Sequence, residues 1–90
     1  MLKLDLSREA DKFVARREPK HQRQIYSRIQ ALREDPTPSD LKSLKGTGEP
    51  FLRVDIGEYR IIYRVEGETL HVPVVGKRNY DEVYRRVKRK

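Results

Sequence analysis

Hydrophobic and polar residues alternate over the first six positions, where Leu2, Leu4 and Leu6 share one face. Strict alternation predicts a β-strand with one buried side. Ser7 follows at a position that suits a helix N-cap, because its side-chain oxygen can accept a hydrogen bond from the first helical turn. The chain is therefore expected to begin with a strand that leads directly into a helix.

Two amphipathic helices are predicted next, one on each side of Pro19. Proline disfavours helix at the residue before it, Glu18, and fits the first turn of a new helix. Asp35-Pro36 ends the second helix. Apolar residues recur at helical spacing in both: they are Ala10, Phe13 and Val14 in the first and Ile25, Ile29 and Leu32 in the second. These faces need a sheet to cover them.

Three strands are predicted in the second half, over residues 51–56, 59–65 and 69–75, which are rich in Val, Ile, Tyr and Leu. Gly57-Glu58 and Gly67-Glu68 fit two-residue hairpin turns between them. Residues 36–50, which hold three prolines and two glycines, are expected to form a loop tethered by Leu41 and Leu44.

Two-residue turns also fix which residues face each other. In the first hairpin, Asp55 is expected opposite Arg60. The other pairs expected there are Ile56 with Tyr59, Val54 with Ile61 and Leu52 with Tyr63. In the second hairpin the expected pairs are Val75 with Arg60, Pro73 with Ile62 and His71 with Arg64. One face of the sheet would then be apolar and meet the helices, and the other would carry arginines, although a one-residue slip would exchange the faces.

The predicted fold class is α+β, with an N-terminal strand, a helical hairpin and an antiparallel three-stranded meander. Together the strands would make a four-stranded sheet packed on the helices, followed by a short C-terminal segment. The 90 residues are expected to form a single domain, 1–90. Since 36% of the residues are hydrophobic and 39% are charged, we expect a small core under a highly charged surface.

Positive charge is concentrated in the helical region and at the C-terminus. The chain has 21 Lys and Arg against 14 Asp and Glu, a net charge of +7. Residues 77–90 hold seven basic and two acidic groups (+5), and residues 7–34 hold eight and four (+4). A domain with this balance favours a polyanion, either a nucleic acid or an acidic protein.

Composition excludes several classes of protein. The absence of cysteine rules out a disulfide scaffold, a thiolate zinc site and a thiol nucleophile. No run of apolar residues predicts a signal peptide or a membrane span, so a soluble, cytoplasmic protein with no membrane partner is expected.

Basic residues and one tyrosine are the candidate site. Guanidinium groups match phosphate oxygens in a bidentate fashion, and a phenol can stack on a base or transfer a proton. The candidates on or next to the polar face of the sheet are Arg53, Arg60, Arg64, Lys77, Arg78 and Tyr84. The same residues also fit a solvated sheet face, with Tyr84 as a hydrophobic lid. The residues alone therefore indicate nucleic-acid binding and leave catalysis open.

Neither a metal nor a cofactor is expected. Metal-dependent cleavage of nucleic acids needs clustered carboxylates, and near the basic face only Asp55 and the pair Asp81-Glu82 are available. His21 is expected at the surface of the second helix. His71 is expected on the basic face, as a structural or RNA-contacting residue rather than a catalytic base.

Several motifs resemble the RelE/ParE toxin superfamily, and its RelE-like branch in particular. They are "LKG" at Leu44–Gly46, "RVDIGEYRIIYRV" from Arg53 to Val65 and "VGKRNYDEVY" from Val75 to Tyr84. The middle motif marks the fold, whereas the "GKR…EVY" ending is more specific to members that cleave mRNA. The resemblance extends from Leu2 to about Val87.

This resemblance implies a toxin of a type II toxin–antitoxin system. Such a toxin enters the ribosomal A site and cleaves mRNA without a metal, by attack of the RNA's own 2′-OH. It also implies a RelB-like antitoxin, and contacts with the 70S ribosome through its 16S rRNA and with mRNA.

The resemblance further implies roles for individual residues. Arg60 would stabilise transition-state charge, Arg78 would act as general acid or phosphate clamp, and Tyr84 would stack on the base and help to deprotonate the 2′-OH. Arg53 matches a basic position of the family. Asp55 stands where a second basic residue is expected, with Lys77 as a candidate replacement.

Two alternatives remain open. One is a ParE-like inhibitor of DNA gyrase, which shares the fold but has no nuclease site. The other is a non-catalytic nucleic-acid-binding module of the same fold, which the acidic residue at position 55 would favour.

Overall fold

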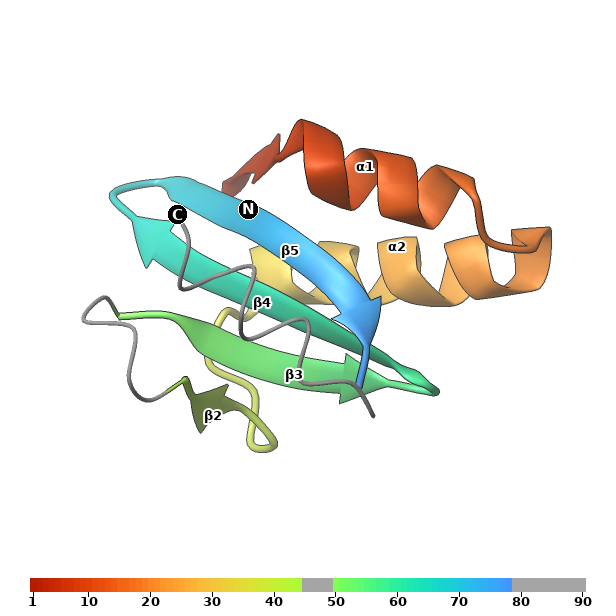
Figure 1. Cartoon of the computed structure of the whole chain (residues 1–90). Helices are drawn as coiled ribbons and strands as arrows, with labels where there is room; N and C mark the ends of the chain where they lie inside the picture. The colour runs from red at the N-terminus through yellow and green to blue at the C-terminus, as the bar shows by residue number, and fades with distance from the viewer. Residues whose placement is uncertain (45–49, 79–90) are drawn as a thin grey trace.

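The computed structural model describes residues 1–44 and 50–78 and shows two helices packed on one face of a mixed sheet (Figure 1). The elements are β1 (Lys3–Leu6), α1 (Arg8–Ala15), α2 (Pro19–Glu34), β2 (Lys42–Ser43), β3 (Leu52–Ile56), β4 (Tyr59–Glu66) and β5 (Thr69–Lys77). The predicted α+β class is confirmed. Tyr84 and the rest of the predicted C-terminal segment lie outside the described residues.

Within the described residues the sheet has five strands, in the order β1-β5-β4-β3-β2, not the four that were predicted. The additional strand, β2, is only two residues long and pairs antiparallel with β3 through Lys42 with Arg53 and Ser43 with Leu52. Part of the predicted loop is therefore an edge strand. Leu44 continues this connection by donating its backbone N–H to the carbonyl of Phe51 at 2.9 Å.

Local sequence signals set both ends of the helical hairpin. Ser7 caps α1, because its Oγ accepts a hydrogen bond from the backbone N–H of Ala10 at 3.0 Å. Pro19 occupies the first turn of α2, as predicted. The helix ends at Glu34, just before Asp35-Pro36.

The first hairpin has the predicted register. Asp55 pairs with Arg60, Val54 with Ile61 and Leu52 with Tyr63. Gly57 and Gly67, the first residues of the two turns, have φ angles of 57° and 60°. No other described residue has a positive φ. A positive φ at the first turn position alone is the pattern of a type II′ turn, which suits the twist of a hairpin.

The second hairpin departs from the predicted register along its length. Near the turn, His71 faces Arg64 as expected. Beyond it, Val74 pairs with Ile62 and Gly76 with Arg60, so the predicted pairs Pro73 with Ile62 and Val75 with Arg60 are wrong. Val72 and Pro73 of β5 together oppose Tyr63 of β4, which is the pattern of a β-bulge.

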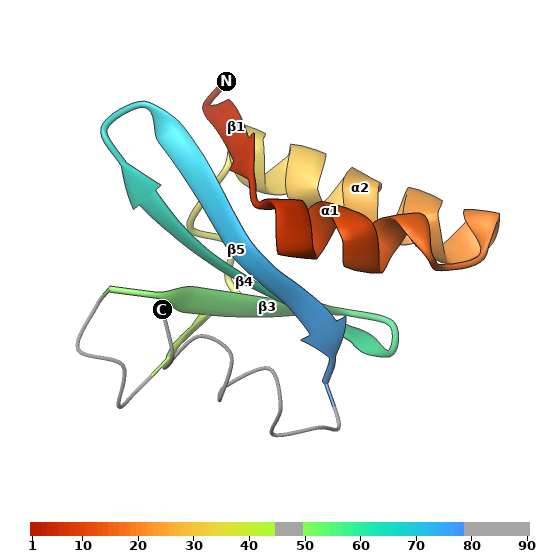
Figure 2. The same cartoon turned by 45° about the horizontal axis from the view of Figure 1, so that its top comes forward.

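Pro73 explains where the bulge lies. Proline has no N–H to give to the ladder, and within a sheet it is tolerated at bulges. Its carbonyl accepts a hydrogen bond at 2.7 Å from the Oγ of Ser7, the residue between β1 and α1. β1 runs parallel to β5, pairing from Lys3 with Thr69 to Leu6 with Val72 (Figure 2).

The main core lies between the helices and the sheet. Its buried residues come from both helices and from β3, β4 and β5, and Leu2, Leu4 and Leu6 pack against its edge. The fully buried members include Val14, Ile25, Ile29, Leu32, Val54, Ile61, Tyr63, Leu70 and Val72. The prediction that the helices meet the apolar face of the sheet is thereby confirmed.

A second, smaller apolar cluster lies on the opposite side of the sheet, called the open face below because neither helix covers it. Its members are Leu44, Phe51, Ile62 and Val74. The open face is thus not only basic, because these four buried apolar residues separate charged groups at its two ends. Neither helix of the described residues is long and apolar enough to cross a membrane.

Candidate phosphate-binding site

Arg60 and Arg78 lie where β3 turns into β4 and β5 ends, and Arg53 lies near the start of β3. Arg53 and Arg60 occupy open-face positions of β3 and β4, because alternate residues of these strands face the helices. Arg78 follows β5 directly, and its backbone N–H donates to the carbonyl of Glu58 at 2.9 Å. That hydrogen bond attaches Arg78 to the β3–β4 turn.

The carboxylate of Asp55 lies beside Arg60. Arg60 donates to it twice, from Nε to Oδ1 at 2.8 Å and from Nη2 to Oδ2 at 3.3 Å. The hydrogen bond from Arg60 is the largest influence on Asp55 and holds its pKa below the usual value, against an opposing effect of partial burial. The positive charges of Arg60, Arg53 and Arg78 lower the pKa further. All three guanidinium groups therefore act on one anionic position.

Such an arrangement suits an oxyanion larger than a carboxylate. The side chain of Arg60 is only 13% exposed, which limits competition from water for its N–H groups. Counted over the residues that the structure describes, the three arginines exceed the one carboxylate in charge. A phosphate could therefore add to this group or replace Asp55 in the Arg60 fork.

Two other predicted residues lie apart from this group. Lys77 pairs with Tyr59, a residue of the main core, so strand alternation places it on the helix side of the sheet. Gly76, not Val75, takes the position opposite Arg60. Arg64 lies on the open face but four residues farther along β4. We name Arg53, Arg60 and Arg78 with Asp55 the arginine cluster.

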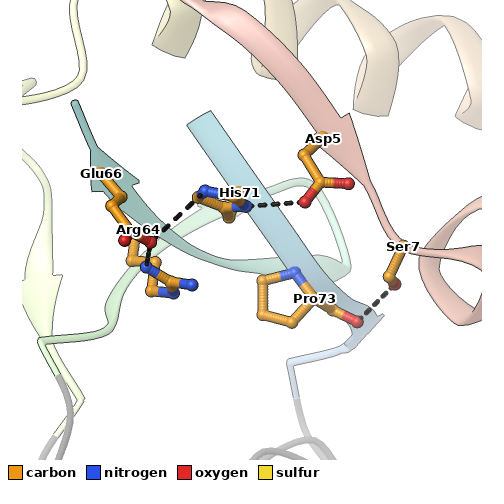
Figure 3. Close-up of polar contacts among 6 residues, drawn as sticks. All are labelled: Asp5, Ser7, Arg64, Glu66, His71 and Pro73. Atoms are coloured by element: carbon orange, nitrogen blue, oxygen red, sulfur yellow. Dashed lines mark hydrogen bonds and ion pairs between the residues drawn. The ribbon is translucent and has the colours of Figure 1, made fainter. Parts of the chain in front are cut away.

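Arg64 belongs to a different polar group at the far end of the open face (Figure 3). Its Nη1 lies 2.5 Å from Glu66 Oε2. His71 lies between two carboxylates, with Nδ1 2.7 Å from Asp5 Oδ2 and Nε2 3.7 Å from Glu66 Oε2. The sequence placed His71 on this face. It gave no sign of Asp5, because β1 joins β5 only through long-range pairing.

His21 was expected at the surface, but it is half-buried. Its Nδ1 lies 2.7 Å from the hydroxyl of Tyr59, and the two rings meet edge to face with centroids 5.3 Å apart. This histidine thus attaches α2 to the start of β4. Among residues 1–44 and 50–78, no three His, Asp or Glu residues are grouped so that they could hold a metal ion.

The sequence model of one protein family, the ParE toxin of the type II toxin–antitoxin system parDE, matches residues 3–81. The chain belongs to this toxin family. No curated protein matches it in sequence.

Solved structures of RelE toxins share the fold. A free mutant of the E. coli toxin RelE has a TM-score of 0.79 at 22% identity and covers 98% of this chain and 95% of its own. For the isolated E. coli RelE toxin, the TM-score is 0.73 and the identity is 24%. The match covers 99% of this chain and 98% of the toxin. For the archaeal RelE–RelB complex from Pyrococcus horikoshii OT3, the TM-score is 0.74 and the identity is 23%. The match covers 86% of this chain and 94% of the archaeal chain. The resemblance of the sequence motifs to the RelE/ParE superfamily is thereby confirmed.

Proposed function

We propose that this toxin is a ribosome-dependent endoribonuclease that cleaves mRNA in the A site and so stops translation. The observation that supports this most directly is the pair of hydrogen bonds from Arg60 to Asp55, beside the positive charges of Arg53 and Arg78 that also lower the pKa of this carboxylate. Three guanidinium groups around one anion match the charge that a phosphate gains as it is attacked.

The proposed reaction needs no external nucleophile. The 2′-OH of the RNA attacks the adjacent phosphorus, and the bond from phosphorus to the 5′ oxygen breaks. The products are a 2′,3′-cyclic phosphate and a 5′-OH. One proton leaves the 2′-OH and one joins the departing 5′ oxygen, so the chain must only position the RNA, neutralise charge and transfer protons.

We assign to Arg60 the stabilisation of charge in the transition state. Arg78 would either bind the phosphate or protonate the leaving oxygen, and Arg53 would bind the substrate. Tyr84, beyond the described residues, is proposed to stack on the base and assist deprotonation. Lys77 and Arg64 are proposed as substrate-binding residues outside the arginine cluster.

A RelB-like antitoxin is the proposed partner in the cytoplasm. RelE toxins of this fold have been solved together with RelB, from Pyrococcus horikoshii OT3 and from E. coli. A net charge of +7 favours an acidic partner that folds on binding, and it equally favours 16S rRNA and mRNA.

Primer extension on translated mRNA tests the proposal. Expression of the toxin should produce breaks inside codons at the A site, and Arg78→Ala or Tyr84→Ala should each abolish them. Arg8→Ala removes the same charge from the exposed start of α1 and serves as the control. Unchanged breaks in both Arg78→Ala and Tyr84→Ala would overturn the assignment.

Inhibition of DNA gyrase is the second candidate, favoured by the match to the ParE family. Addition of the protein to a gyrase supercoiling assay and to a translation extract separates the two. A gyrase inhibitor blocks only the first, and a ribosome-dependent nuclease only the second. Salt-sensitive RNA binding with no effect in either assay would indicate a non-catalytic module, for which Asp55 is the motivating residue.

A further inference from the structure

The far end of the open face contains a hollow of about 310 Å³ that the proposed cleavage chemistry does not use. Polar and apolar residues share its lining, which consists of Asp5, Ser7, Phe51, Arg64, His71, Val72 and Pro73. Ligand pockets in proteins begin at about 300 Å³. This hollow therefore has room for a group of the size of a nucleobase.

Hydrogen bonding in the hollow is only partly satisfied within the chain. The hydroxyl of Ser7 is already hydrogen-bonded within the chain: it accepts from the backbone N–H of Ala10 and donates to the carbonyl of Pro73. Asp5 uses Oδ2 for His71 and is 61% exposed, so its carboxylate keeps capacity to accept further hydrogen bonds.

Donors lie on the other side of His71 (Figure 3). Arg64 gives Nη1 to Glu66, and a guanidinium group has five N–H donors in all. The hollow thus offers a carboxylate acceptor at one side and a guanidinium donor at the other. Phe51 and Pro73 supply apolar surface between the strands.

Charge argues against a phosphate at this end. Asp5 and Glu66 bring two negative charges against the one fixed positive charge of Arg64, whereas the arginine cluster has three cations and one anion. A neutral ligand with hydrogen-bonding edges fits the hollow better than an anion does.

We propose that this hollow binds the base of a nucleotide near the cleaved phosphate and prefers cytosine to uracil. The amino group of cytosine can donate to the Asp5 carboxylate. Its N3 and O2 can accept hydrogen bonds from the Arg64 guanidinium. Uracil presents a carbonyl where cytosine has the amino group, and that oxygen would face the carboxylate of Asp5.

The position of the hollow fits one RNA strand that lies along the open face. Arg60 and Arg64 share that face of β4 and are four residues apart, or about 13 Å. Ile62 and Val74, which are fully buried, lie between them, so the RNA would contact this face through the polar groups at its two ends. This inference rests on the proposed RNA substrate, because the arginine cluster would hold the phosphate while the hollow selects a base.

Titration of the full-length ¹⁵N-labelled protein with cytidine or uridine, followed by NMR, tests the proposal. These nucleosides lack a phosphate, so they probe the hollow and not the arginine cluster. Cytidine should shift the amide signals of Asp5, His71 and Val72 and bind at least about fivefold tighter than uridine, since one good pairing to a base edge contributes about 1 kcal/mol or more.

Asp5→Asn should abolish the preference, and so should Arg64→Met, which removes the N–H donors instead. Asp40→Asn is the matched control, because Asp40 is 54% exposed and pairs with Arg28 away from the hollow. Equal binding of both nucleosides, no shifts at the hollow, or an unchanged preference in both variants would overturn the proposal. If the cytidine preference is found but mRNA is not cut, only the proposed function fails. If mRNA is cut without the preference, only the base pocket fails.

Discussion

Arg60 and Asp55 face each other across the first hairpin and are joined by two hydrogen bonds, at 2.8 and 3.3 Å. An arginine that is proposed to bind phosphate is therefore already paired with a carboxylate of its own chain. This pair keeps the guanidinium group in a fixed orientation at the surface of the sheet. It also means that a bound phosphate competes with Asp55 for the same N–H donors.

We expect Asp55→Asn to strengthen RNA binding. The amide keeps the size of the carboxylate but removes its charge, so a phosphate no longer competes with an anion at position 55 for the Arg60 N–H groups. For single-stranded RNA, one added phosphate contact steepens the slope of log K against log[salt] by about 0.7. Fluorescence anisotropy of a short labelled RNA, measured over a range of NaCl concentrations, gives this slope.

Asp40→Asn is the control for the general effect of removing a negative charge. Asp40 pairs with Arg28 of α2, so its loss should leave the slope nearly unchanged. Equal slopes for the wild type and Asp55→Asn would mean that Asp55 does not restrict the arginine cluster.

Ser7→Ala should destabilise the fold by about 1–3 kcal/mol, because it removes a helix cap and a part-buried hydrogen bond together. The cap is the bond from Ala10 N–H to Ser7 Oγ, and the other bond joins Ser7 Oγ to the carbonyl of Pro73. Urea unfolding monitored by circular dichroism measures the change. Ser27→Ala, at an exposed position of α2, should differ from the wild type by less than about 0.5 kcal/mol. Equal stabilities for the two variants would show that the link from α1 to the bulge contributes little.

Ile61→Ala should cost about 2–5 kcal/mol, because it leaves a cavity in the main core. Ile61 is fully buried between the sheet and the helices, whereas Val65 on the same strand is 38% exposed. Val65→Ala is therefore the control, and thermal unfolding of the two variants compares them. A loss below about 0.5 kcal/mol for Ile61→Ala would contradict the assigned facing of β4.

Local signals in the sequence were sufficient for the first hairpin. Gly57 permits a two-residue turn, and alternation on both sides of it then sets the pairing of Asp55 with Arg60. The second hairpin could not be predicted in the same way. Its bulge depends on Pro73 and on Ser7, which is 66 residues away in sequence. A two-residue strand such as β2 is too short to show alternation at all.

The same bulge limits what could be predicted of the site. It shifts every pair beyond His71 by one residue, so Gly76 rather than Val75 faces Arg60, and Lys77 falls on the helix side. Arg78 still reaches the arginine cluster because its backbone is bound to Glu58. The contact between His21 and Tyr59 spans 38 residues, and no local pattern indicates it.

Tyr63 should make the fold sensitive to alkali. Its side chain is fully buried, its hydroxyl donates to the carbonyl of Pro36 at 2.8 Å, and burial raises its pKa to about 12 from 10.0. Because the pKa is higher in the folded state, this contribution to stability is complete below pH 10.0, the unfolded value, and is lost as the pH rises through about 12.

Tyr63→Phe should therefore be less stable than the wild type near neutral pH, by about 0.5–1.5 kcal/mol for the lost hydrogen bond. It should also lose less stability above pH 10.0 than the wild type does. Tyr26→Phe is the comparison: partial burial and the hydrogen bond to Asp11 raise the pKa of Tyr26 too, but this tyrosine is exposed, so its effect should have the same sign and be smaller. Urea unfolding at a series of pH values gives both quantities for each variant. If the alkaline loss is the same in Tyr63→Phe and the wild type, the buried phenol is not its source, and the basic groups of the surface must account for it.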